Sequence, residues 1–67
     1  MKIKEGDMVT IVKTIPEWNW LPFKEGDIGM VLGSDYNPNF TMLTVFIFRT
    51  KQRESIPEYF VEKMEKQ

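Results

Sequence analysis

The chain has 67 residues, of which 42% are hydrophobic, and its 9 Lys and Arg residues nearly balance its 10 Asp and Glu residues. A chain of this length forms one small domain, residues 1–67, with an expected ordered core of about residues 6–64. It contains no Cys and no His, which excludes disulfides, thiolate metal sites and the commonest general base. The net charge of −1 argues against a nucleic-acid partner, because phosphate contacts supply most of the affinity of such binders.

The composition also predicts no membrane span, no cofactor and no metal ion. No apolar run approaches the ~20 residues of a spanning helix, and the first residues lack the apolar core of a signal peptide, so we expect a cytoplasmic protein. Asp7, Asp27 and Asp35 could be imagined as a metal site, but two of them follow Gly in turns, where the carboxylate bonds the backbone. No Ser or Thr has an evident base, so we expect a protein that is not an enzyme.

Five short stretches predict strands, because they are rich in β-branched and aromatic residues that alternate along the chain. In chain order these are Met8–Lys13, Ile28–Gly33, Thr41–Arg49, Glu54–Ile56 and Phe60–Met64. A 3₁₀ turn is expected at Pro57–Tyr59, and Gly29 within the second strand indicates a bend or a close backbone approach. Five strands in so short a chain favour an all-β fold closed into a small barrel, since closure removes exposed strand edges. No internal repeat is visible.

The segment between the first two strands, Thr14–Glu25, is long and unusually apolar. Pro16 and Pro22 exclude a regular helix or a central strand. Loops much longer than about 4–6 residues are often functional. Trp18 and Trp20 either cover an open end of the core or form a recognition surface. Because one residue separates them, we expect at least one of the two to be partly exposed.

The third predicted strand is apolar on both faces. Val45 and Ile47 lie on one face, and Phe46 and Phe48 lie on the other. One face of a small barrel should contact water. Either the long loop covers the additional apolar face, or that face forms an interface, for which a homodimer through Val45 and Ile47 is one possibility.

Two segments resemble Src-homology-3 domains. Ile56–Val61 (IPEYFV) resembles their Ile-Pro-x-x-Tyr-Val segment, and Phe23–Ile28 (FKEGDI) resembles their Phe-x-Lys-Gly-Asp element. The resemblance implies a five-stranded SH3-like barrel and an aromatic groove for polyproline helices, with Pro57 in place of the groove proline and Phe60 in place of the groove tyrosine. The first strand lacks the Ala-Leu-Tyr-Asp-Tyr motif of that family, and the third lacks its paired tryptophans.

A second branch of SH3-like proteins matches more of the chain. Gly6–Val12 followed by Asp27–Val31 is similar to the Gly-x-x-Val-x-Val and x-x-Gly-x-Val pattern of single-domain members. These include the photosystem I reaction-centre subunit IV, the variable chain of ferredoxin–thioredoxin reductase, and KOW modules. The similarity extends over roughly Gly6–Met64. It implies docking or scaffolding, or RNA contact as in KOW modules.

Together these features predict a non-catalytic module that docks on another protein through an aromatic surface. The candidate contact surface includes the loop residues Trp18–Phe23, and its named contact residues are Glu17, Trp18, Trp20, Tyr36, Pro57, Tyr59 and Phe60. An acidic rim that includes Glu58 favours a partner with Lys or Arg near its docking segment. One alternative is a KOW-like nucleic-acid contact through Arg49, Lys51 and Arg53, and another is a small phage or accessory protein that acts on a host assembly.

Overall fold

The computed structural model describes residues 3–15, 17, 20–36 and 38–64. Their elements are β1 (Met8–Ile11), β2 (Ile28–Tyr36), β3 (Thr41–Ile47), β4 (Gln52–Pro57), the 3₁₀ turn η1 (Glu58–Phe60) and β5 (Val61–Lys63). All strand pairs are antiparallel. The predicted all-β fold, with five strands, a long first loop and a 3₁₀ turn before the last strand, is confirmed. Within the described part of the chain, no helix is long and apolar enough to cross a membrane.

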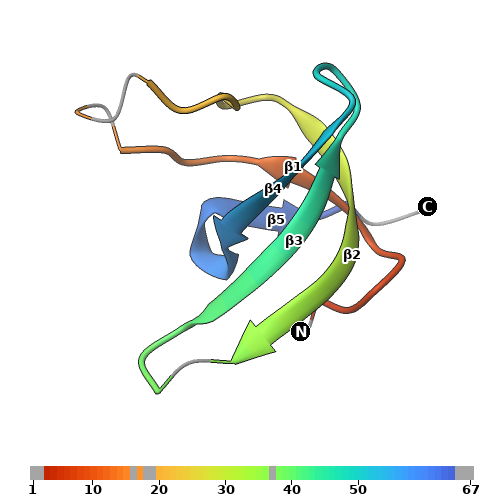
Figure 1. Ribbon diagram of the computed structural model, residues 1–67, viewed down its shortest axis with the longest axis vertical. Coiled ribbons are helices and arrows are strands. Elements are labelled where there is room, and N and C mark those ends of the chain that lie inside the picture. Colours follow the sequence, from red (N-terminus) through yellow and green to blue (C-terminus); the bar gives the residue numbers. More distant parts are fainter. Residues whose placement is uncertain (1–2, 16, 18–19, 37, 65–67) are drawn as a thin grey trace.

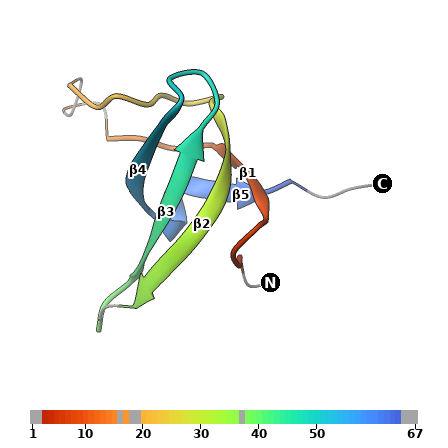
Figure 2. The same ribbon diagram turned by 45° about the vertical axis from the view of Figure 1, so that its right-hand side comes forward.

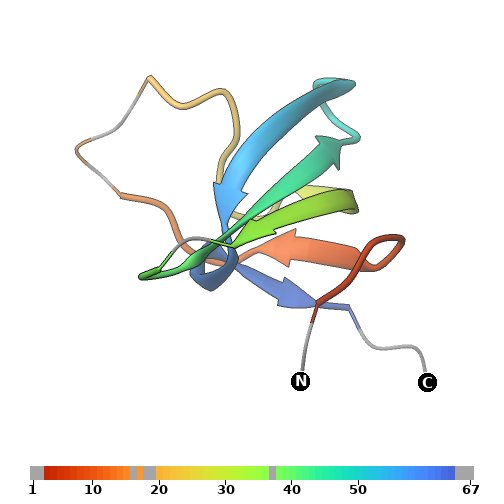
Figure 3. The same cartoon turned by 60° about the horizontal axis from the view of Figure 1, so that its bottom comes forward.

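The strands form one curved sheet in the order β4-β3-β2-β1-β5, which Figure 3 shows as a fan. The predicted closure into a barrel is wrong, because β4 and β5 are the two edges of the sheet and do not pair with each other. The long β2 and β3 run diagonally across the molecule, and β1 and β5 cross behind them (Figure 1, Figure 2). The turn η1 connects the two edges instead, and its Phe60 carbonyl accepts hydrogen bonds from the backbone N–H groups of Val12 and Lys13 at 2.8 and 3.2 Å.

The core lies inside the curve of the sheet and receives side chains from every strand. Its members are Val9, Ile11, Phe23, Val31, Leu43, Val45, Ile47, Ile56, Phe60 and Val61. The alternation in β1 and β3 predicts which residues share a face, and burial follows it. Val45 and Ile47 are both 0% exposed, so in this fold they pack in the core and offer no exposed surface for the homodimer contact considered above. The outward face of β3 carries Phe46, with Phe48 just beyond its end.

The hairpin of β2 and β3 differs from the predicted boundaries. β2 continues to Tyr36 because its last residues pair with the start of β3, where Tyr36 lies opposite Thr41. This cross-strand pairing outweighs the local turn preference of the Asp- and Asn-rich sequence. β3 ends at Ile47, since the chain turns there and the Lys51 N–H donates to the Ile47 carbonyl at 2.7 Å.

Gly29 confirms the predicted close approach of another backbone. A Cβ atom at this position would lie 2.5 Å from the Phe46 carbonyl oxygen and 2.6 Å from Cγ1 of Val45. Both distances are too short for a carbon atom, so only glycine allows β3 to pack this closely against β2.

The tetrapeptide Lys-Glu-Gly-Asp occurs twice, at residues 4–7 and 24–27. In both copies the Asp N–H donates to the Lys carbonyl, at 3.0 and 3.1 Å, and the Lys N–H donates to the Asp carboxylate at 2.9 Å. The two glycines have φ of 93° and 94°. The turns lie at opposite ends of the β1–β2 pair, in which Val9 is opposite Gly29. The inferred absence of a repeat is therefore wrong at the scale of one turn.

Candidate functional site

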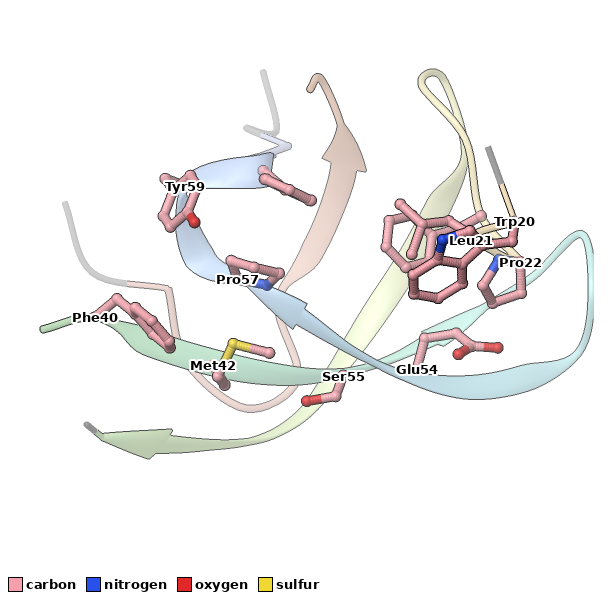
Figure 4. Close-up of a pocket in the computed structure, with 11 residues that line it drawn as sticks. Trp20, Leu21, Pro22, Phe40, Met42, Glu54, Ser55, Pro57 and Tyr59 are labelled. Atoms are coloured by element: carbon pink, nitrogen blue, oxygen red, sulfur yellow. The ribbon is translucent and has the colours of Figure 1, made fainter. Parts of the chain in front are cut away.

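A groove with a volume of about 480 Å³ lies between the long first loop and the β4–η1 edge of the molecule (Figure 4). Its lining consists of Trp20, Leu21, Pro22 and Phe23 from the loop, Phe40 just before β3, Met42 near the start of β3, and Glu54, Ser55, Pro57, Tyr59 and Phe60 from β4 and η1. Most of these side chains are apolar. Segments far apart in the sequence therefore build one hydrophobic surface, which is typical of a binding site.

One wall of the groove, the loop wall, consists of residues 20–23, and contacts with the core hold it in place. Phe23 is buried in the core, and Leu21 packs against it. With these two side chains turned inward, Trp20 stays 70% exposed. Of the two roles considered for the tryptophans, covering the core therefore falls to Phe23 and Leu21 rather than to Trp20. Trp18 lies outside the described residues.

The opposite wall is formed by the end of β4 and by η1. Tyr59 is 56% exposed, whereas the adjacent Phe60 is 1% exposed. Their rings meet edge to face, with centroids 5.2 Å apart, and the Lys13 ammonium group lies 5.8 Å from the centre of the Tyr59 ring. Phe60, which the family resemblance places on the binding surface, is thus a core residue beneath the groove. The accessible aromatic ring here is that of Tyr59, beside the half-buried Pro57.

The structure does not bring the whole predicted set together. Tyr36, which is 72% exposed at the end of β2, and Glu17 do not line the groove. Residue-by-residue reading of the sequence missed Phe40, Met42, Glu54 and Ser55. A signal was present in part, since pairing β3 with β4 as a hairpin places Met42 opposite Pro57.

An ion pair fastens the loop wall to the turn between β3 and β4. The Arg49 guanidinium donates from Nε to Asp27 Oδ1 and from Nη2 to Asp27 Oδ2, both at 2.8 Å. Nη2 also donates to the Pro22 carbonyl at 3.3 Å, and the Lys24 N–H donates to the same carboxylate at 2.9 Å. Two parallel bonds to one carboxylate fix orientation as well as distance. The position of Pro22, and with it the loop wall, therefore depends on Arg49.

The same ion pair changes the titration of both partners. The hydrogen bonds from Arg49 lower the pKa of Asp27 below its ordinary value, and the Lys24 N–H adds to this effect while burial opposes it. In turn, Asp27 raises the pKa of Arg49. Of the basic residues considered for nucleic-acid contact, Arg49 is thus engaged within the molecule, and Lys51 and Arg53 are exposed.

Across residues 3–15, 17, 20–36 and 38–64, no three carboxylates gather in a way that could hold a metal ion. Comparison with protein-family models found no matching family, and comparisons with curated proteins and with solved structures found no significant match. The interpretation of the groove consequently depends on its own geometry.

Proposed function

We propose that this protein is a non-catalytic docking module that binds an extended segment of another protein in the groove. The observation that carries the proposal is the exposed Trp20 on one wall opposite Pro57 and Tyr59 on the other (Figure 4). Aromatic side chains supply large contact areas at a small entropic cost and dominate binding energy at interfaces. A cytoplasmic location, expected from the sequence, is part of the same proposal.

The groove favours a segment that contains both apolar and basic side chains. Glu54 is the charged member among the described residues that line it. Glu58, half-buried on η1, precedes the exposed Tyr59. A Lys or Arg of the partner would complement these carboxylates, while its apolar neighbours fill the space between Trp20 and Tyr59.

The test is selection of binders from a displayed library of random linear peptides, followed by calorimetry with the purified protein. Trp20→Ala should weaken binding about tenfold or more, because truncating an interface hot spot costs ~2 kcal/mol. Tyr36→Ala is a matched control, since Tyr36 and Trp20 are 72% and 70% exposed but only Trp20 lines the groove. Equal losses in the two variants would contradict the proposal.

The nucleic-acid alternative is tested in the same samples. Titration with single-stranded RNA at low salt should leave the amide NMR spectrum unchanged if the groove is the functional site. Shifts centred on Lys51 and Arg53 that vanish as salt is added would favour the alternative.

A further inference from the structure

The groove lies beside an open edge of the sheet. Among the described residues, β4 is the outermost strand on its side of the sheet and pairs with β3 alone. In an antiparallel edge strand, alternate residues direct their N–H and C=O groups away from the sheet, where an added strand can bond them. The opposite edge, β5, spans only Val61–Lys63, whereas β4 extends from Gln52 to Pro57. β4 is therefore the longer of the two edges.

The open edge of β4 and the hydrophobic groove are parts of one surface. Glu54, Ser55 and Pro57 of β4 all line the groove, and Trp20 and Pro22 face them from the loop (Figure 4). An added strand would lie ~4.8 Å from β4. Its backbone could then bond β4 while the side chains on one of its faces enter the groove.

We infer that the partner segment binds as an additional β-strand along β4, with a Lys or Arg opposite Glu54. This inference rests on the proposed function and specifies how the partner is held. Residues opposite each other in a sheet share a face. Glu54 shares its face with the buried Val45, and Arg53 shares the opposite face with Phe46. The segment should therefore carry a basic residue opposite Glu54 and an adjacent acidic residue opposite Arg53.

Pro57 sets one end of the paired region. It has no backbone N–H, so it cannot donate to an added strand. Beyond it the chain enters η1, where the extended conformation ends. The N–H groups that β4 can donate to a partner thus lie within Gln52–Ile56, and affinity beyond this short ladder must come from the side chains in the groove.

The experiment uses the peptides selected above. Each is synthesised as a series of variants, and each variant carries one N-methyl group on a different backbone amide. Strand addition predicts that methylation at alternate residues lowers affinity about tenfold, while the intervening residues tolerate it. Binding should also slow hydrogen exchange of alternate amides within Gln52–Ile56. Glu54→Gln should weaken binding about three- to fivefold, and Glu62→Gln, an exposed carboxylate on β5, serves as its control.

The outcomes separate the two proposals. One outcome is that the peptides require Trp20 for binding while their affinity shows no alternation with the position of the N-methyl group, as expected for proline-rich sequences. That result would overturn strand addition and leave the docking function intact. Selected peptides whose binding is insensitive to Trp20→Ala would overturn both. An alternating pattern in which Glu54→Gln has no effect would overturn the basic residue assigned to the partner.

Discussion

The two Lys-Glu-Gly-Asp turns have the same sequence and the same backbone hydrogen bonds, but their aspartates have different partners. Asp7 is 13% exposed and lies 3.6 Å from the Lys63 ammonium group. Asp27 is 6% exposed and accepts two hydrogen bonds from Arg49. The comparison shows that four residues suffice to specify the turn. How strongly the turn is tied to the rest of the molecule depends on which basic residue the fold places beside it.

The difference also has a spatial consequence. The first turn connects through Lys63 to β5, which is the opposite edge of the sheet from β4. The second turn connects through Arg49 to Pro22, which lines the groove. One copy of the repeat thus supports an edge of the sheet, and the other supports the wall of the candidate site.

The largest effect on stability is expected from a substitution that makes the strand after the second copy of the repeat more like the strand after the first. Gly29 occupies the position that corresponds to Val9 in the first copy. Gly29→Val should destabilise the fold by about 3 kcal/mol, because the added atoms collide with the Phe46 carbonyl and Val45. Urea denaturation measures this change. Gly33→Ala is the control, since nothing lies within 4 Å of a Cβ at Gly33, and a loss as large there would contradict the explanation.

The next largest effect should come from Asp27→Ala. Removing this carboxylate leaves the Lys24 N–H without its acceptor and removes both acceptor oxygens that Asp27 offers to Arg49, so we expect a loss of about 2 kcal/mol in the free energy of unfolding. Asp7→Ala should cost less, because its partner is more distant. Asp27→Ala should also shift the amide NMR signals of Trp20–Phe23, and Asp7→Ala should not. Equal losses of stability in the two variants would show that the turn, rather than the ion pair, carries the difference.

The pH dependence of stability should follow the same ion pair. The folded-state pKa of Asp27 lies below its ordinary value of 3.8, so its contribution is fully present above that value and disappears as the pH falls through the lower folded-state pKa. The difference in unfolding free energy between the wild type and Asp27→Asn should therefore be constant from pH 7 to 5 and shrink below 3.8. A difference that is unchanged at pH 2 would exclude the charge of Asp27 as its cause.

The smallest effect concerns a third turn, where a side chain replaces the glycine. Lys51 has φ of 59°, in the region where both repeat turns have Gly. Lys51→Gly should stabilise the protein by about 0.5–1 kcal/mol, because the strain of an L-residue in this region exceeds the entropic cost of glycine. Thermal unfolding measures the change, and destabilisation would mean that the Lys51 side chain makes a compensating contact.

Much of the local structure could be predicted from single residues and their spacing. The alternation of Val9 with Ile11 and of Val45 with Ile47 is a property of the strand itself, so the shared faces are visible before folding. The close approach at Gly29 was likewise predictable from a glycine inside a strand. The openness of the sheet was not, because closure depends on whether β4 and β5, the two edge strands, come close enough to pair with each other.

The sequence alone therefore determined the all-β fold, the turns and the apolar load of the first loop, because these follow from backbone preferences and short-range periodicity. Only the tertiary structure decided that Val45 and Ile47 face the core, that Arg49 pairs with Asp27 rather than Asp7, and that Trp20, Pro57 and Tyr59 share one groove. Each of these choices is a contact between segments far apart in the chain. Local sequence patterns cannot specify such contacts, since they depend on how the whole sheet curves and on which side chains the core can accommodate.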